Sequence, residues 1–147
     1  MAGRKRKYGI DFSGWDVDVF DDPKIEQLID RMGLDGFVVF FCVCQRIYAG
    51  DGYYMPWSQE MAPGIRKALG GCVDSRFVMD VVDLCLDLGL FLPDTFAQYG
   101  VLTSRAIQRN YAAVLTRRRR KDVAAEYWVL PESESNGAEP APLALLG

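Results

Sequence analysis

The sequence contains no histidine and only four cysteines, and both shortages remove whole classes of site. Cys42, Cys44, Cys72 and Cys85 form no Cys-x-x-Cys pair, so the usual ligand spacing of a zinc site is missing. Without histidine, the chain lacks the side chain that is most often used for acid–base catalysis. The chain also lacks a phosphate-binding Gly-x-x-x-x-Gly-Lys loop and a Gly-x-Ser-x-Gly elbow. These absences predict a protein that is not an enzyme and that holds no metal and no cofactor.

Long apolar runs and targeting signals are also missing. The longest wholly apolar run, Phe37 to Cys44, is much shorter than the roughly 20 residues of a membrane-spanning helix. The basic start of the chain lacks the apolar core of a signal peptide. Half of the 147 residues are hydrophobic, so the chain can bury a core without disulfides. We therefore expect one soluble, cytoplasmic domain with free, buried thiols and no membrane contact.

The net charge of −3 hides a strong segregation of charge along the chain. Residues 1–7 carry +4, and residues 8–104 hold six basic side chains against fifteen acidic ones. Residues 105–121 hold seven basic side chains and no acidic one, and residues 122–147 carry −5. A basic block that persists in an acidic protein is typical of phosphate binding, although such blocks also serve as solvated tails.

Apolar residues at helical spacing predict a mainly helical protein. Asp22 is expected to cap the first helix, and Gly33 is expected to end it. Asp74 or Ser75 is expected to cap the fourth helix. Thr103 or Ser104 would cap the last helix. The predicted helices cover residues 23–32, 36–49, 58–69, 75–88 and 104–121. The third of these is expected to bend at Pro63-Gly64. Short strands are predicted at 53–57 and 90–92, and a strand or an apolar latch at 127–130.

This order of elements predicts the fold class: mainly α, or α+β, with a winged-helix variant of the helix-turn-helix and a basic C-terminal helix. Residues 1–8 form a basic tail and residues 9–130 the domain. From residue 131 onward Pro, Glu, Ser, Gly and Ala predominate, which predicts a disordered tail over 131–147.

Five stretches, taken together, resemble the N-terminal domain of phage and prophage replisome-organiser-like proteins, whose winged helix is similar to that of DnaD-type primosome proteins. These stretches keep the order and spacing of that family and span most of residues 10–130. They are Trp15 to Ile25, Gly33 to Phe37, Ile47 to Tyr54, Tyr99 to Tyr111, and Glu126 to Trp128. The resemblance implies a winged-helix fold and a place in loading or organising the replication machinery on DNA. It assigns no binding residue.

The basic block is the candidate DNA contact. Arg105 and Arg109 lie one helical turn apart, and a run of cations follows without any acid, so each cation can pair with a phosphate. The mobile basic N-terminal tail would add non-specific contacts. The predicted DNA-binding residues are Arg105, Arg109, Arg117, Arg118, Arg119, Arg120 and Lys121, with Arg4, Lys5, Arg6 and Lys7 from the tail.

The fourth helix would be the reading helix of a winged-helix protein, but its polar stripe is acidic. Asp80, Asp83 and Asp87 would repel a phosphate backbone, so we expect a solvated face or a protein-docking face there. Two further interpretations are less favoured. Tyr53, Tyr54 and Trp57 would stack bases only if they were not core residues, and the carboxylates between Asp16 and Glu26 would hold magnesium only in a shared cleft.

Two functions of different classes remain open. The first is a DNA-binding accessory of phage or mobile-element replication that grips phosphates through its basic helix. The second is an interaction or self-association module for assembling replisome proteins, using the acidic face or the apolar strand from Tyr53 to Trp57. The expected partners are accordingly DNA, replisome proteins and a second copy of the chain.

Overall fold

The longest helix, α1 (Pro23–Ala49), consists of two helices that meet at Gly33. This computed structural model describes residues 9–11, 13–117, 122–124, 127–131 and 139–141. A short 3-10 helix, η1 (Val19–Asp21), precedes α1, and the side chain of Asp22 accepts a hydrogen bond from the backbone N–H of Lys24 at 2.9 Å. Gly33 has φ 74° and ψ −174°, values that break the helical path. The predicted cap and the predicted break are both confirmed.

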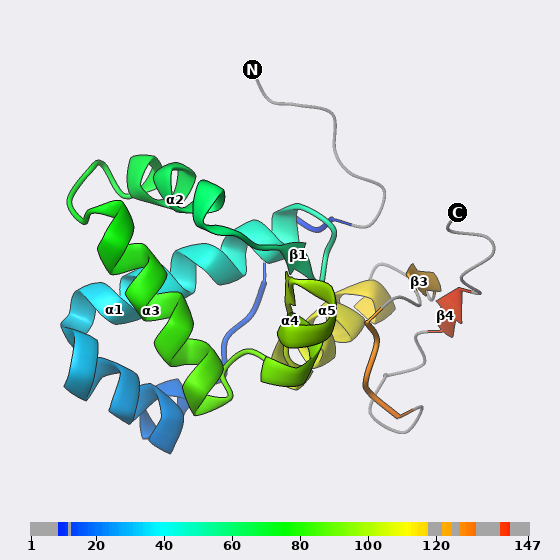
Figure 1. Ribbon diagram of the computed structural model, residues 1–147. Helices are drawn as coiled ribbons and strands as arrows, with labels where there is room; N and C mark the ends of the chain where they lie inside the picture. The colour runs from blue at the N-terminus through cyan, green and yellow to red at the C-terminus, as the bar shows by residue number, and fades with distance from the viewer. Residues whose placement is uncertain (1–8, 12, 118–121, 125–126, 132–138, 142–147) are drawn as a thin grey trace.

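The second half of α1 packs against α3 (Ser75–Leu88), and this contact forms the centre of the core. Asp74 caps α3 by accepting from the backbone N–H of Phe77 at 2.7 Å, and Gly89 ends the helix in the left-handed conformation. Both ends of α3 agree with the sequence. Figure 1 shows α3 lying across α1, with α2 beside both helices. The prediction of a mainly helical protein is confirmed.

The middle of the chain differs from the prediction in three places. The helix predicted over 58–69 is a 3-10 turn, η2 (Gln59–Met61), followed by α2 (Ala62–Ala68), because Pro63 takes the second position of α2 instead of bending a longer helix. The strand predicted over 90–92 is wrong. The chain there leads into an unpredicted helix, α4 (Pro93–Tyr99), because Pro93 starts a helix and Gly100 ends it in the left-handed conformation.

A two-strand antiparallel sheet joins segments that are distant in sequence. β1 (Met55–Pro56) pairs with β2 (Val101–Leu102), so the strand predicted over 53–57 is shorter than expected. The side chains of Tyr53 and Trp57 are 0% and 6% exposed. Because β2 pairs with this strand inside the chain, the apolar strand gives no reason for self-association.

The last described long helix, α5 (Arg105–Arg117), is anchored at its start. Ser104 accepts from the backbone N–H of Ile107 at 3.1 Å, as expected for a capping residue. The segment 127–130 is a latch and not a strand. Tyr127 and Trp128 pack against the core, and the wholly buried amide of Gln108 bonds to the carbonyl of Tyr127 and the N–H of Val129, each at 2.8 Å.

Part of the predicted tail has regular structure. β4 (Glu139–Ala141) pairs in parallel with β3 (Asp122–Ala124), so the expectation of a wholly disordered 131–147 is wrong for these three residues. The extension of the last helix over 118–121, the basic tail 1–8 and the rest of the 132–147 tail lie outside the described residues.

One described helix, α1, is long and apolar enough to cross a membrane by length and composition alone, with a mean hydropathy of 1.4 over its most apolar window. Core helices of soluble proteins meet the same criterion. Gly33 divides this helix, and each part is shorter than the roughly 20 helical residues that span a bilayer. The buried side of its second part faces α3 in the core.

Candidate functional site

The described cations of the basic block lie on the outer side of α5. The buried side of the helix carries Ile107, Tyr111 and Leu115. Arg105 and Arg109 are exposed, and their spacing of four residues places them one helical turn apart on one side. The sequence therefore predicts their juxtaposition correctly. Arg117 ends α5, but its side chain and residues 118–121 and 4–7 lie outside what the structure describes.

The acidic residues of α3 also lie together. The carboxylate of Asp80 accepts from Nε of Arg76 at 3.1 Å, and the two side chains are 44% and 85% exposed. Burial raises the pKa of Asp83 above its ordinary value, and the charges of Asp80 and Asp87 raise it further. We call Asp80, Asp83 and Asp87 the acidic ridge. The three carboxylates repel one another, and the same charges would repel a phosphate group.

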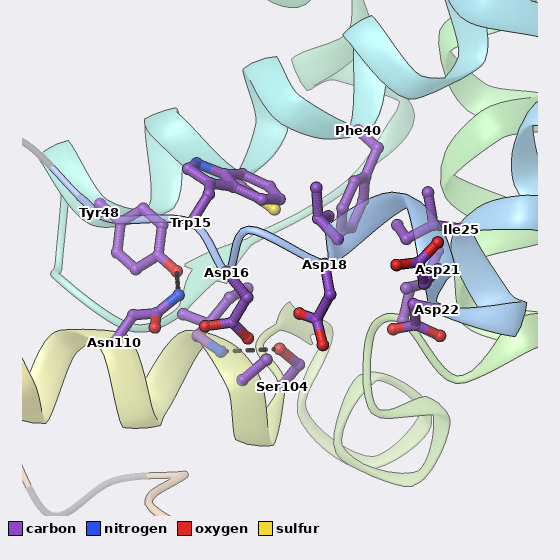
Figure 2. A pocket seen from close by; sticks show the side chains of 15 residues that line it. Trp15, Asp16, Asp18, Asp21, Asp22, Ile25, Phe40, Tyr48, Ser104 and Asn110 are labelled. Atoms are coloured by element: carbon purple, nitrogen blue, oxygen red, sulfur yellow. Dashed lines mark hydrogen bonds between the residues drawn. The ribbon is translucent and has the colours of Figure 1, made fainter.

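A pocket of about 370 Å³ separates the segment 15–22 from the start of α5. Figure 2 shows Asp16 and Asp18 projecting toward α5, with Asp21 and Asp22 further along the same rim. Apolar and aromatic residues line the pocket together with these carboxylates, and the Nδ2 group of Asn110 donates to the hydroxyl of Tyr48 at 3.1 Å. The apolar lining residues are Trp15, Val19, Ile25, Phe40, Cys44, Leu90, Ala106 and Ile107.

Acidic side chains gather at the edge of the pocket. Its rim carries the carboxylates of Asp16, Asp18, Asp21 and Asp22, and these charges repel a phosphate backbone. Arg105 and Arg109 are not among the residues that line the pocket. Among the described residues, no group of three His, Cys, Asp or Glu side chains is arranged to hold a metal ion.

The aromatic residues near β1 are packed inside the domain. The rings of Tyr53 and Tyr111 lie 5.6 Å apart, and that of Trp128 lies 5.0 Å from Tyr53. With Tyr53 and Trp57 buried, only Tyr54 is partly exposed among the three aromatic residues considered for base stacking. The interpretation as core packing is confirmed.

Sequence reasoning missed the polar residues that fix α5. Gln108 is wholly buried, and its Nε2 group donates to Oγ1 of Thr103 at 3.1 Å as well as to the carbonyl of Tyr127. The spacing of Gln108 indicates its burial, because it lies three residues before Tyr111 and seven before Leu115, on the apolar side of the helix. Thr103 in turn donates to the carbonyl of Tyr53. The orientation of α5, and with it that of Arg105 and Arg109, is set by this buried network.

Comparison with known proteins now adds the family. The model of the Lin1244/Lin1753-like, N-terminal family matches residues 13–107, which include η1, α1 to α4, both strands of the first sheet and the start of α5. The chain belongs to this family. It is 29% identical over 131 residues to the phage-related protein Lin1244/Lin1753 of Listeria innocua serovar 6a. The alignment covers 89% of this chain and 42% of that relative. No solved structure matches the chain.

Membership in the Lin1244/Lin1753-like family confirms the expected association with phage. The chain spans less than half the length of its Listeria relative, so the match concerns the N-terminal part of a longer kind of protein.

Proposed function

We propose that this domain is a DNA-binding accessory of phage DNA replication that contacts the phosphate backbone through α5 and the basic tract that follows it. The observation that carries the proposal is the position of Arg105 and Arg109, one turn apart on the outer side of α5, in a helix that leads into a tract of five cations over residues 117–121. Each phosphate contact releases condensed counterions and so favours binding.

The arrangement of elements supports the winged-helix part of the proposal. α2 and α3 pack together across a turn containing Gly70 and Gly71, as in a helix-turn-helix. β1 precedes this pair and β2 follows it, as the flanking strands of a winged-helix domain do, whereas α4 occupies the connection from α3 to β2. In this arrangement α3 is in the place of the reading helix, and its acidic ridge favours contact through α5 instead.

The proposal is tested by fluorescence anisotropy with labelled single-stranded and duplex DNA at two salt concentrations. Arg105→Gln combined with Arg109→Gln should weaken binding to all sequences about equally. Neutralising residues 117–121 should weaken it further and reduce the salt slope by about 0.9 for each lost phosphate contact on duplex DNA. Arg76→Gln is the matched control, because this exposed arginine lies beside the acidic ridge and should leave affinity almost unchanged.

Two results would overturn this assignment. One is the absence of binding by the parent chain at low salt. The other is normal binding by the neutralised tract together with lost binding when Asp80, Asp83 and Asp87 are replaced by asparagine. We expect those asparagine replacements to preserve or strengthen binding, because they remove charges that repel phosphate.

The acidic ridge favours a second candidate function, docking of a basic replisome protein without DNA contact. Burial and the charges of Asp80 and Asp87 hold the pKa of Asp83 above its ordinary value, and a cationic partner would relieve the repulsion among the three carboxylates. The asparagine variant separates the two functions. It should lose partner assembly under the second proposal and retain DNA binding under the first.

A further inference from the structure

The second part of α1 exposes an apolar stripe. Leu34 is 71% exposed, Val38 45% and Phe41 38%, and half-buried Cys42 lies beside them. These four residues, called here the α1 stripe, fall on one side of the helix by their spacing. Only 39% of the most apolar window of α1 is buried. A contiguous apolar surface of this kind is typical of an interaction site.

Aromatic contacts fix one border of the stripe. The ring of Phe41 lies 5.0 Å from that of Trp15, and the ring of Phe20 lies 5.2 Å from that of Phe37. Phe20 is itself 57% exposed and extends the apolar surface beyond the helix. Because these rings pack against one another, the surface is preorganised, and binding to it costs little side-chain entropy.

The other border carries two opposite charges. Asp35 and Arg46 are the only charged residues between Leu34 and Ala49, and both are exposed. They lie eleven residues apart, which is about three turns and about 16 Å along the helix. Three turns return nearly to the starting direction, so both charges flank the same side of the α1 stripe, one near each end.

We propose that the α1 stripe is the contact surface of an antiparallel dimer formed with a second copy of this chain. A two-fold axis near the middle of the stripe sets Asp35 of one copy opposite Arg46 of the other, and the reverse contact follows by symmetry. The uncharged middle of the stripe then faces its own equivalent. A parallel pair, related by an axis along the helices, would leave the charged border of each copy on opposite sides of the contact, so only the antiparallel arrangement brings Asp35 and Arg46 together.

The first experiment measures mass in solution for the full chain at concentrations up to tens of micromolar. The parent should shift from 16.5 kDa toward twice that mass as concentration rises. Val38→Glu should hold the chain at the monomer mass, because it places a charge in the centre of the contact. Met61→Glu is the control, since Met61 is similarly exposed, at 40%, but lies outside the stripe. A parent that stays monomeric overturns the proposal.

The second experiment tests the orientation by exchanging charges. Asp35→Arg alone and Arg46→Asp alone each create two repulsive contacts per dimer and should weaken dimerisation roughly tenfold. The double variant restores both pairs and should return the dissociation constant to within about threefold of the parent. A dimer that neither variant changes is parallel or uses another surface, and a dimer that single variants strengthen is not held by these two pairs; both results overturn the proposal.

Labelling of the Cys42 thiol distinguishes the other occupants of the stripe. Cys42 should react with a thiol reagent quickly in dilute protein and slowly in concentrated protein. Slow reaction at every concentration, from a chain that stays at the monomer mass, means that another part of the same chain covers the stripe. A monomeric parent is also tested for flotation with phosphatidylcholine and phosphatidylglycerol vesicles. If the parent floats and Val38→Glu abolishes that flotation, the stripe binds a membrane surface. Either of these results overturns the dimer.

Discussion

The side-chain amide of Gln108 donates to the backbone carbonyl of Tyr127 at 2.8 Å, and this contact joins α5 to the segment 127–130. The same amide accepts from the N–H of Val129 at 2.8 Å, so Gln108 satisfies two backbone groups of one extended segment. Gln108 is wholly buried, and a lost partner there leaves polar groups without water.

Replacing Gln108 by leucine should lower the free energy of unfolding by about 2–4 kcal/mol, because the carbonyl of Tyr127 and the N–H of Val129 lose their partner. Urea denaturation measures the loss. Asn110→Ala is the comparison, since Asn110 makes a single, partly buried hydrogen bond to Tyr48 and its removal should cost about 1 kcal/mol. Equal losses in the two variants would contradict the role given to Gln108.

The ends of α1 and α3 are predictable from the sequence because the signals that set them are local. Asp22 and Asp74 accept from N–H groups within three residues, and Gly89 supplies the left-handed turn that follows α3. The exposure of Arg105 and Arg109 is equally predictable, because the apolar residues of α5 define its opposite side.

The remaining features depend on contacts between distant segments. Val101 and Leu102 form a strand because they meet Pro56 and Met55, and nothing within residues 90–102 reveals that partner. α4 is seven residues long and buries none of its side chains fully, so it leaves no periodic pattern to detect. The burial of Gln108 depends in the same way on backbone groups about twenty residues further along the chain.

Gly33→Ala should lower stability by about 1–3 kcal/mol, because alanine disfavours the backbone conformation with φ 74° and ψ −174°. Nothing lies within 4 Å of an added Cβ there, so the cost comes from the backbone alone. Gly64→Ala is the matched control, since its added Cβ also meets nothing and the residue is inside helix α2. That substitution should raise stability by about 0.5–1 kcal/mol, as thermal melts can measure.

Asp83→Asn should raise the melting temperature at neutral pH. Burial and the charges of Asp80 and Asp87 raise the folded-state pKa of Asp83, so its ionisation weakens the fold as the pH rises through that value. The advantage of asparagine should disappear as the pH falls below the ordinary pKa of 3.8, where Asp83 is protonated in both states. Asp94→Asn should have the opposite sign at neutral pH, because Asp94 lies in the first turn of α4. An Asp83→Asn gain that persists in acid would contradict this account.

The four thiols should react with a thiol reagent at different rates. Cys72 is exposed and should react first, whereas Cys44 and Cys85 should react only when the chain unfolds. Burial raises the pKa of both buried thiols, and the thiolate is the reactive form. Mass spectrometry of the labelled chain in native buffer and in denaturant measures the order. Native labelling of Cys44 or Cys85 at the rate of Cys72 would show that the core opens.

The position of Gln108 relative to its partners also governs when the fold can be completed during synthesis. A growing chain emerges from the ribosome with its N-terminus first, so α1, α3 and the first two turns of α5 are available before Tyr127 and Val129. Until those residues emerge, the amide of Gln108 lacks the backbone hydrogen-bond partners that offset the cost of burying it. The α1 to α3 body therefore forms early, and the closing of α5 onto the core waits for translation to pass residue 130.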